Sequence, residues 1–141
     1  MSATALSNRA TRAQDAYNAA FAARDWDAMA ASYTSEIVND DRRTGVSSGV
    51  TVGHEQILEL VRGLVEVGFT TVTTVPIAVR GERLALLRRT WHQADGFDLP
   101  LLAVGEVDAD GRTTANVMFD AEDMAAAVAE LERRYLAGEQ P

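Results

Sequence analysis

Residues 36–45, EIVNDDRRTG, place two carboxylates and two arginines at the end of an apolar segment. Side chains alternate between the two faces of a β-strand, so Asp41 shares a face with Ile37 while Asp40 points the other way. A carboxylate beside a core can have its pKa raised by burial, which suits it to accept a proton. The competing interpretation is an ordinary ion pair between Asp41 and one of the two arginines that follow it.

The first half of the chain, which must position this strand, is predicted to be mainly helical. Small and aromatic side chains recur there at the three- and four-residue spacing of one helical face. Asp25 is a suitable cap for the second helix. The predicted elements are a helix at 7–24, a short helix after Asp25, a strand at 36–41, a loop at 42–53 with a small strand at 50–52, and a helix at 54–67.

The second half is predicted to form a sheet, because its segments are rich in β-branched and aromatic residues and are separated by turn residues. Helices followed by a long antiparallel meander indicate an α+β fold. We expect one domain, 1–141, with a cone-shaped curved antiparallel sheet packed against the N-terminal helices, and a C-terminal helix. The predicted strands lie at 69–79, 84–93, 97–107 and 112–119, and the last helix runs from Asp120 to Gly138.

Turn geometry predicts which side chains share a sheet face. A two-residue loop at Asp95 and Gly96 sets His92 opposite Leu99, and a three-residue loop at 109–111 sets Leu101 opposite Phe119. One face would then form an apolar wall with a few polar groups, which is typical of a small-molecule pocket. The predicted ligand-binding side chains are Asn39, Arg88, Thr90, Leu99, Leu101, Ala103, Val117 and Phe119, with His92 beside them.

Composition narrows the classes of partner. The formal net charge is −8 and the pI is about 4.7, so the electrostatic field of the chain repels nucleic acids and anionic membrane surfaces. There is no cysteine and there are only two histidines, so the sequence does not predict a metal site built from cysteine or histidine ligands. No segment approaches the roughly 20 apolar residues that span a bilayer. We therefore expect a cytoplasmic protein without nucleic-acid or membrane partners, metal or organic cofactor.

Three segments resemble landmarks of a known superfamily: AYNAAFAARDWDAMAASYTSEIVNDD at 16–41, GHEQILELVRGL at 53–64 and GRTTANVMFDAEDM at 111–124. They are similar to the nuclear transport factor 2-like superfamily, SnoaL-like branch. The resemblance implies a curved sheet that encloses a pocket. It leaves the reaction open, because the superfamily includes ketosteroid isomerases, polyketide cyclases, epoxide hydrolases, dehydratases and binding modules without catalysis.

The resemblance also implies roles for individual residues. Alignment with ketosteroid isomerases sets Tyr17 at the oxyanion-binding tyrosine and Asp41 at the general-base aspartate. The second pocket acid of that family falls near Ala103, and the acids of limonene epoxide hydrolases would fall at Asn116 and Val117. Neither of those two reactions is therefore implied in full.

We expect a cofactor-independent enzyme that isomerises, cyclises, dehydrates or hydrates an apolar carbonyl or epoxide compound. Asp41 would take a proton, Tyr17 would donate a hydrogen bond to the oxygen that gains charge, and His92 would share that role or return the proton. The alternative is a non-catalytic ligand-binding or dimerisation module of a regulatory system. In that case Tyr17 is a core residue and His92 is exposed near a turn.

A homodimer is expected with either function. The sheet face opposite the predicted pocket would expose Leu87, Trp91, Leu102 and Val104, which is enough apolar surface to require a cover. A second copy of the chain would provide that cover.

Overall fold

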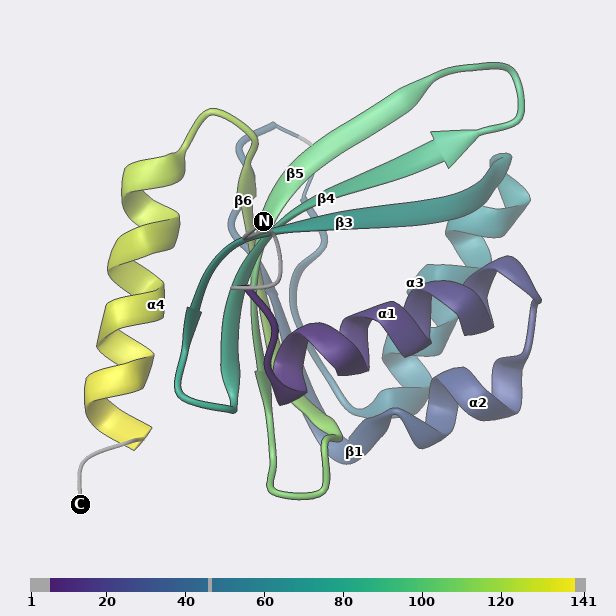
Figure 1. Ribbon diagram of the computed structural model, residues 1–141. Coiled ribbons are helices and arrows are strands. Elements are labelled where there is room, and N and C mark those ends of the chain that lie inside the picture. Colours follow the sequence, from purple (N-terminus) through teal and green to yellow (C-terminus); the bar gives the residue numbers. More distant parts are fainter. Residues whose placement is uncertain (1–5, 46, 139–141) are drawn as a thin grey trace.

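The computed structural model describes residues 6–45 and 47–138 and consists of one curved sheet with helices on both faces (Figure 1). Three helices lie on one face and a single helix on the other. The helices are α1 (Arg9–Ala22), α2 (Trp26–Ala31), α3 (His54–Glu66) and α4 (Met124–Gly138). The strands are β1 (Tyr33–Asp41), β2 (Gly49–Val52), β3 (Phe69–Arg80), β4 (Leu84–Gln93), β5 (Asp98–Val107) and β6 (Thr113–Asp120).

The strand order is β2-β1-β6-β5-β4-β3, which contains the predicted antiparallel meander of β3 to β6. The α+β prediction is confirmed, with one addition. Strand β1 pairs antiparallel with β2 but parallel with β6, so the sheet is mixed. A long connection that contains α3 and the other strands brings β6 back beside β1, and such a connection permits a parallel pair.

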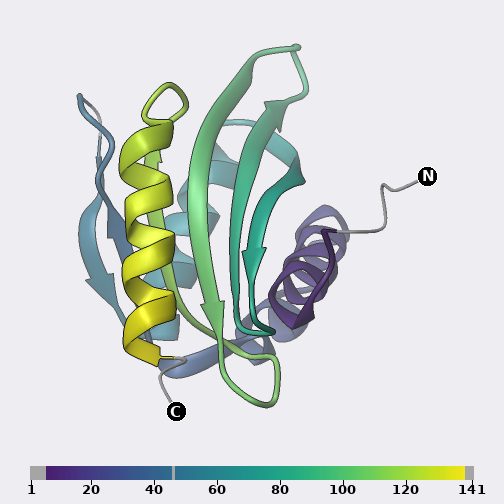
Figure 2. The same ribbon diagram turned by 60° about the vertical axis from the view of Figure 1, so that its left-hand side comes forward.

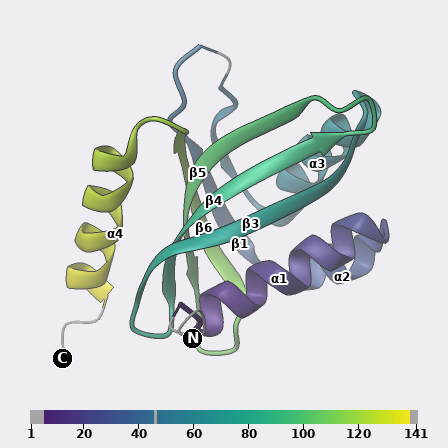
Figure 3. The same cartoon turned by 45° about the horizontal axis from the view of Figure 1, so that its top comes forward.

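The sheet is strongly bent, and β3, β4 and β5 curve over α1, α2 and α3 (Figure 3). Irregular pairing within β3, next to Thr70 and Ile77, accompanies the bend. Bulges of this kind increase the twist and bend of a strand locally. Curvature gives the sheet a concave face that is covered by α1 to α3 and a convex face that is crossed by α4 (Figure 2).

The predicted strand register is wrong at both hairpins, by one residue each. The β4–β5 loop holds three residues, because Gln93 pairs with Phe97 and Gly96 takes a positive φ of 96°. Trp91, not His92, therefore lies opposite Leu99. A positive φ at the last loop residue is typical of three-residue hairpins.

The β5–β6 loop has the predicted three residues, but a bulge follows it. Glu106 pairs with Ala115 and Val107 with Thr113, which leaves Thr114 without a partner residue. Beyond the bulge, Leu102 lies opposite Phe119 and Ala103 opposite Met118. Because side chains alternate, this shift moves Phe119 to the convex face of the sheet.

Two main apolar cores result, one on each face. The concave core holds Phe21, Ile37, Trp91 and Leu101 between the sheet and α1 to α3. The convex core packs β4 to β6 against α4 and includes Leu102 and Val104, while Leu87 contacts α1 on the concave side. The prediction that a second copy must cover this face is therefore wrong, because α4 of the same chain already covers Leu102 and Val104. Among the described residues, no helix is both long and apolar enough to cross a membrane.

Asn8 fastens the start of α1 to the β3–β4 turn. Its Oδ1 accepts from the Thr11 backbone N–H at 2.9 Å, and its Nδ2 donates to the carbonyls of Gly81 at 3.0 Å and Leu84 at 2.9 Å. The residue is 1% exposed. The position of α1, which carries Tyr17, thus depends on a buried amide.

Asn8→Ala is expected to lower the free energy of unfolding by about 2 kcal/mol, because it removes a helix cap and leaves buried carbonyls without donors. Chemical denaturation measures this change. Asn8→Ser keeps a capping oxygen and should recover about half of the loss. Equal stability of Asn8→Ala and the unchanged protein would contradict the assigned role.

Candidate functional site: a pocket on the concave face

A pocket of about 180 Å³ opens between the concave face of the sheet, α1 and α3. An apolar cavity of about 150 Å³ in another protein accepts benzene, so this volume accommodates a small organic molecule. Apolar side chains form most of the wall, and the charged side chains and the two tyrosines lie in two clusters. The lining residues are Ala13, Gln14, Tyr17, Tyr33, Asn39, Asp41, Arg43, Ser48, Ile57, Leu60, Val61, Leu64, Arg89, Trp91, Leu99, Leu101, Thr113, Asn116 and Met118.

The first polar cluster surrounds Asp41, the last residue of β1. Arg43 donates from Nε to Oδ1 at 2.9 Å and from Nη2 to Oδ2 at 2.7 Å, which is a two-point ion pair. The backbone N–H and the hydroxyl of Ser48 also donate to Oδ2, at 3.0 and 3.1 Å, and the backbone N–H of Arg43 donates to Oδ1 at 3.2 Å. The carboxylate is thus surrounded by donors.

These contacts decide the protonation state of Asp41. Burial raises its pKa, but the hydrogen bonds from Arg43 and Ser48 outweigh burial and lower the pKa to about 2. The expectation that burial would raise the pKa of Asp41 is therefore wrong. The alternative of an ion pair with one of the following arginines holds for Arg43, whereas Arg42 pairs with Asp40 and Glu130.

The second polar cluster consists of Tyr17 on α1, Tyr33 on β1 and Arg89 on β4. The two tyrosine rings lie 5.7 Å apart between centroids. Burial raises the pKa of both phenols, and the Arg89 cation acts in the opposite direction on each. Both tyrosines therefore stay protonated near neutral pH and can donate hydrogen bonds to an oxygen in the pocket.

The structure brings five of the predicted site residues to this pocket. Asp41 and Asn39 reach it because alternation along β1 sends both inward with Ile37, and Tyr17 reaches it from α1. Leu99 and Leu101 complete the set on β5. Ala103 lies on the same face in the concave core but does not line the pocket.

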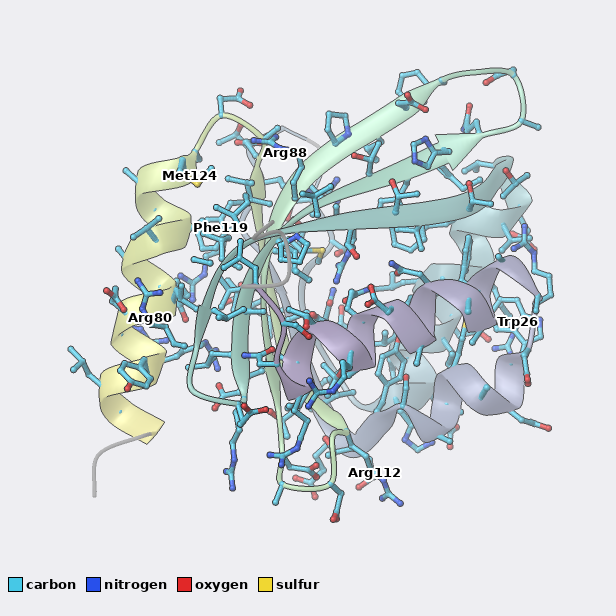
Figure 4. All side chains as sticks on the ribbon, in the orientation of Figure 1. Trp26, Arg80, Arg88, Arg112, Phe119 and Met124 are labelled. Carbon is cyan, nitrogen blue, oxygen red and sulfur yellow. The ribbon has the colours of Figure 1, made fainter. Side chains whose placement is uncertain are left out.

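The other predicted residues lie on the convex face, because the register is shifted by one residue. His92 contacts Thr73 and Asp98 there, at 2.8 Å each. Phe119 packs between β6 and α4 (Figure 4). Arg88, Thr90 and Val117 share this face.

Residues that sequence reasoning missed complete the pocket. Arg89 and Trp91 on β4 were assigned to the wrong face by the same register error. Tyr33 lies at the start of β1, which begins three residues earlier than predicted. Ser48 lies in the segment that was predicted only as a loop, and no spacing in the sequence links it to Asp41. Among the described residues, no group of three or more His, Asp or Glu side chains is arranged to hold a metal ion.

A curved mixed sheet with three helices on its concave side and a pocket between them is the architecture of nuclear transport factor 2-like proteins. Residues 14–116, more than half of the chain, match the family model described as a SnoaL-like domain. The chain belongs to the SnoaL-like domain family. None of the curated proteins matches it in sequence.

Similar solved structures share the fold at low sequence identity. A Kribbella flavida protein is 19% identical with a TM-score of 0.64, covering 90% of this chain and 99% of its own. Mycobacterium tuberculosis RV0760c is 18% identical with a TM-score of 0.65, covering 83% and 94%. An LEH-like epoxide hydrolase of M. tuberculosis is 20% identical with a TM-score of 0.60, covering 92% and 96%.

Proposed function

We propose that this chain is a cofactor-independent enzyme that binds an apolar carbonyl or epoxide compound in the concave pocket and converts it by acid–base chemistry. The observation that carries the proposal is that Asp41, the one carboxylate among the described lining residues, shares the pocket with the buried phenol of Tyr17. Asp41 accepts a proton from the substrate. Tyr17 donates a hydrogen bond to the substrate oxygen as it gains negative charge.

The low pKa of Asp41 limits the substrates that fit this proposal. A carboxylate with a pKa of about 2 is ionised at every physiological pH, but it is a weak base. Proton transfer to it is therefore fastest from an already acidic C–H group, such as one between two carbonyls. Isomerisation or cyclisation of a dicarbonyl compound is the reaction that best suits such a base.

Solved structures of the same fold include proteins that bind small molecules, which supports the proposal of a small-molecule ligand. RV0760c of M. tuberculosis has been solved in complex with estradiol-17β-hemisuccinate, a structure that is 15% identical to this chain with a TM-score of 0.59. Another structure of the same fold is a designed binder of 17-OHP, 15% identical with a TM-score of 0.64. We further propose a cytoplasmic location and a homodimer whose interface lies outside the convex core that α4 covers. Light scattering coupled to gel filtration tests the dimer, because the mass of two chains would support it and the mass of one chain would exclude it.

The experiment that tests catalysis is solvent deuterium exchange into a panel of apolar ketones and 1,3-dicarbonyl compounds, followed by NMR. Exchange next to the carbonyl should be accelerated by the protein, reduced at least about 100-fold by Asp41→Asn, and reduced about 10-fold by Tyr17→Phe. The matched control is Asp98→Asn on the convex face, which should leave exchange unchanged. Equal exchange by Asp41→Asn and the unchanged protein would eliminate Asp41 as proton acceptor.

Non-catalytic binding is the second candidate function, and one observation favours it. The carboxylate of Asp41 accepts five hydrogen bonds from the protein. Few of its lone pairs are therefore free to accept a proton from a substrate. In that case the panel compounds bind and raise the melting temperature, but no exchange above the solvent rate is detected.

A further inference from the structure

Arg89 is a buried cation with an incomplete set of partners. The residue is 6% exposed, lies at the middle of β4 and lines the pocket. Its Nη2 donates to Oε1 of Gln14 at 2.8 Å, whereas its Nε is buried and has no hydrogen-bond partner. Among the described residues, the titratable groups that act on its charge are the phenols of Tyr17 and Tyr33, and both are uncharged near neutral pH.

Such an arrangement is costly for the folded protein. Burying an arginine without an anion removes its hydration and returns little Coulomb energy, so the buried charge opposes folding. The other strongly buried charges among residues 6–45 and 47–138 are each compensated by an opposite charge: Asp41 by Arg43, and Glu130 by Arg133 and Arg134. Arg89 departs from that pattern, and it lines a pocket in which a ligand can supply the missing anion.

The charge of the pocket wall supports the same conclusion. Its charged lining residues are one acid, Asp41, and two arginines, Arg43 and Arg89. The ion pair of Asp41 with Arg43 is neutral as a unit. The net charge of the pocket lining is therefore that of Arg89, one positive charge. The chain as a whole carries −8. An anionic ligand thus meets a favourable local charge inside a protein that repels anions elsewhere.

We propose that Arg89 binds a carboxylate of the ligand, so that the pocket selects a small organic acid with an apolar body. The guanidinium N–H groups that Gln14 does not occupy donate to the carboxylate, an interaction that is stronger than one between neutral groups. Trp91, Leu101 and Val61 contact the apolar body. This inference rests on the proposed function of the same pocket and specifies its substrate class as a dicarbonyl compound that also carries a carboxylate, for which a simple keto acid serves as a binding probe.

Calorimetric titration with 4-oxo-4-phenylbutanoate and with its primary amide tests the inference. The two probes have the same size and differ in charge. The unchanged protein should bind the acid at least about 10-fold more tightly than the amide, because a charged hydrogen bond contributes about 1.5–3 kcal/mol. Arg89→Gln should weaken the acid at least about 10-fold and leave the amide unchanged, so that the preference disappears.

Two further variants separate a binding role from a structural one. Arg88→Gln, one residue earlier and on the convex face (Figure 4), should keep the full preference for the acid. Arg89→Met should unfold at the same temperature as the unchanged protein or a higher one, since it removes an unpaired buried charge.

The outcomes are distinct for the two proposals. Equal binding of acid and amide by the unchanged protein, or a melting temperature of Arg89→Met that falls by more than about 5 °C, would overturn the role of Arg89. In the first of these cases the proposed function survives with a neutral ketone as substrate. Failure of both probes to bind would count against both proposals.

Discussion

Arg43→Gln is expected to raise the pKa of Asp41 from about 2 to above its ordinary value and to destabilise the fold by about 3 kcal/mol at pH 7. The side chain of Asp41 is fully buried, and Arg43 is the cation that pairs with it. Without that cation, burial acts on the carboxylate against only the hydrogen bonds from Ser48 and one backbone N–H. A buried charge that has lost its partner is destabilising.

Thermal unfolding and an NMR titration of the Asp41 carboxyl group measure both effects. For a chain of this length, 3 kcal/mol corresponds to a fall of roughly 10 °C in melting temperature. The double variant Asp41→Asn/Arg43→Gln removes the unpaired charge and should regain most of the loss. An unchanged pKa and melting temperature in Arg43→Gln would mean that the ion pair does not govern Asp41.

The same variant also distinguishes the two candidate functions. If Asp41 is the proton acceptor, a higher pKa makes it a stronger base, so deuterium exchange at neutral pH should accelerate in Arg43→Gln. If the protein only binds its ligand, exchange stays at the solvent rate in both proteins.

Glu130→Gln is expected to lower the free energy of unfolding by about 3 kcal/mol. The Glu130 side chain is 5% exposed on α4 and accepts from Arg134 at 2.7 Å and from Arg42, after β1, at 3.1 Å, with Arg133 as a third partner. The substitution removes the anion that three arginines share, although Arg42 keeps its pair with Asp40 and Arg134 keeps its pair with Glu106. Glu132→Gln on the same helix is the matched control, because its pair with Arg80 is exposed to solvent and should contribute much less to stability.

The pH dependence of unfolding follows from the same group. Burial raises the pKa of Glu130, but its hydrogen bonds from Arg133 and Arg134 lower it to about 2, below the value of about 4.3 in an unfolded chain. The stabilisation is therefore complete above about pH 4.3 and is lost as pH falls toward 2. Denaturation between pH 5 and 2 should show a shallower decline in Glu130→Gln, and identical slopes in both proteins would contradict this assignment.

The helices and strands were easier to predict from the sequence than the register between neighbouring strands. Asp25 and the helical periodicity define α1 to α3 locally, and the alternation in EIVNDD correctly sends Asp41 inward, away from Asp40. Register depends on single residues that carry no periodic signal. Gly96 suits either a two- or a three-residue loop, and nothing in the sequence marks Thr114 as the bulged residue. The loop at Gly96 decided whether His92 or Trp91 faced the pocket, and the bulge at Thr114 decided whether Phe119 or Met118 did.

The candidate site was predicted where it lies on β1 and missed where it lies on β4. The arginine pair at 42 and 43 has two separate uses, because Arg43 turns to Asp41 on the concave side while Arg42 contacts Asp40 and Glu130. Arg89 has no neighbour in the sequence that identifies it as a buried charge. Its importance becomes visible only when its surroundings are known.

The most direct test of the account is a crystal structure of the protein with 4-oxo-4-phenylbutanoate. The ligand is predicted to lie in the concave pocket, with its ketone oxygen within hydrogen-bond distance of the Tyr17 hydroxyl and its carboxylate on Arg89. The carbon next to the ketone should face Asp41. A ligand bound outside this pocket, or bound in it without contact to Tyr17 and Asp41, would contradict the assignment of the site.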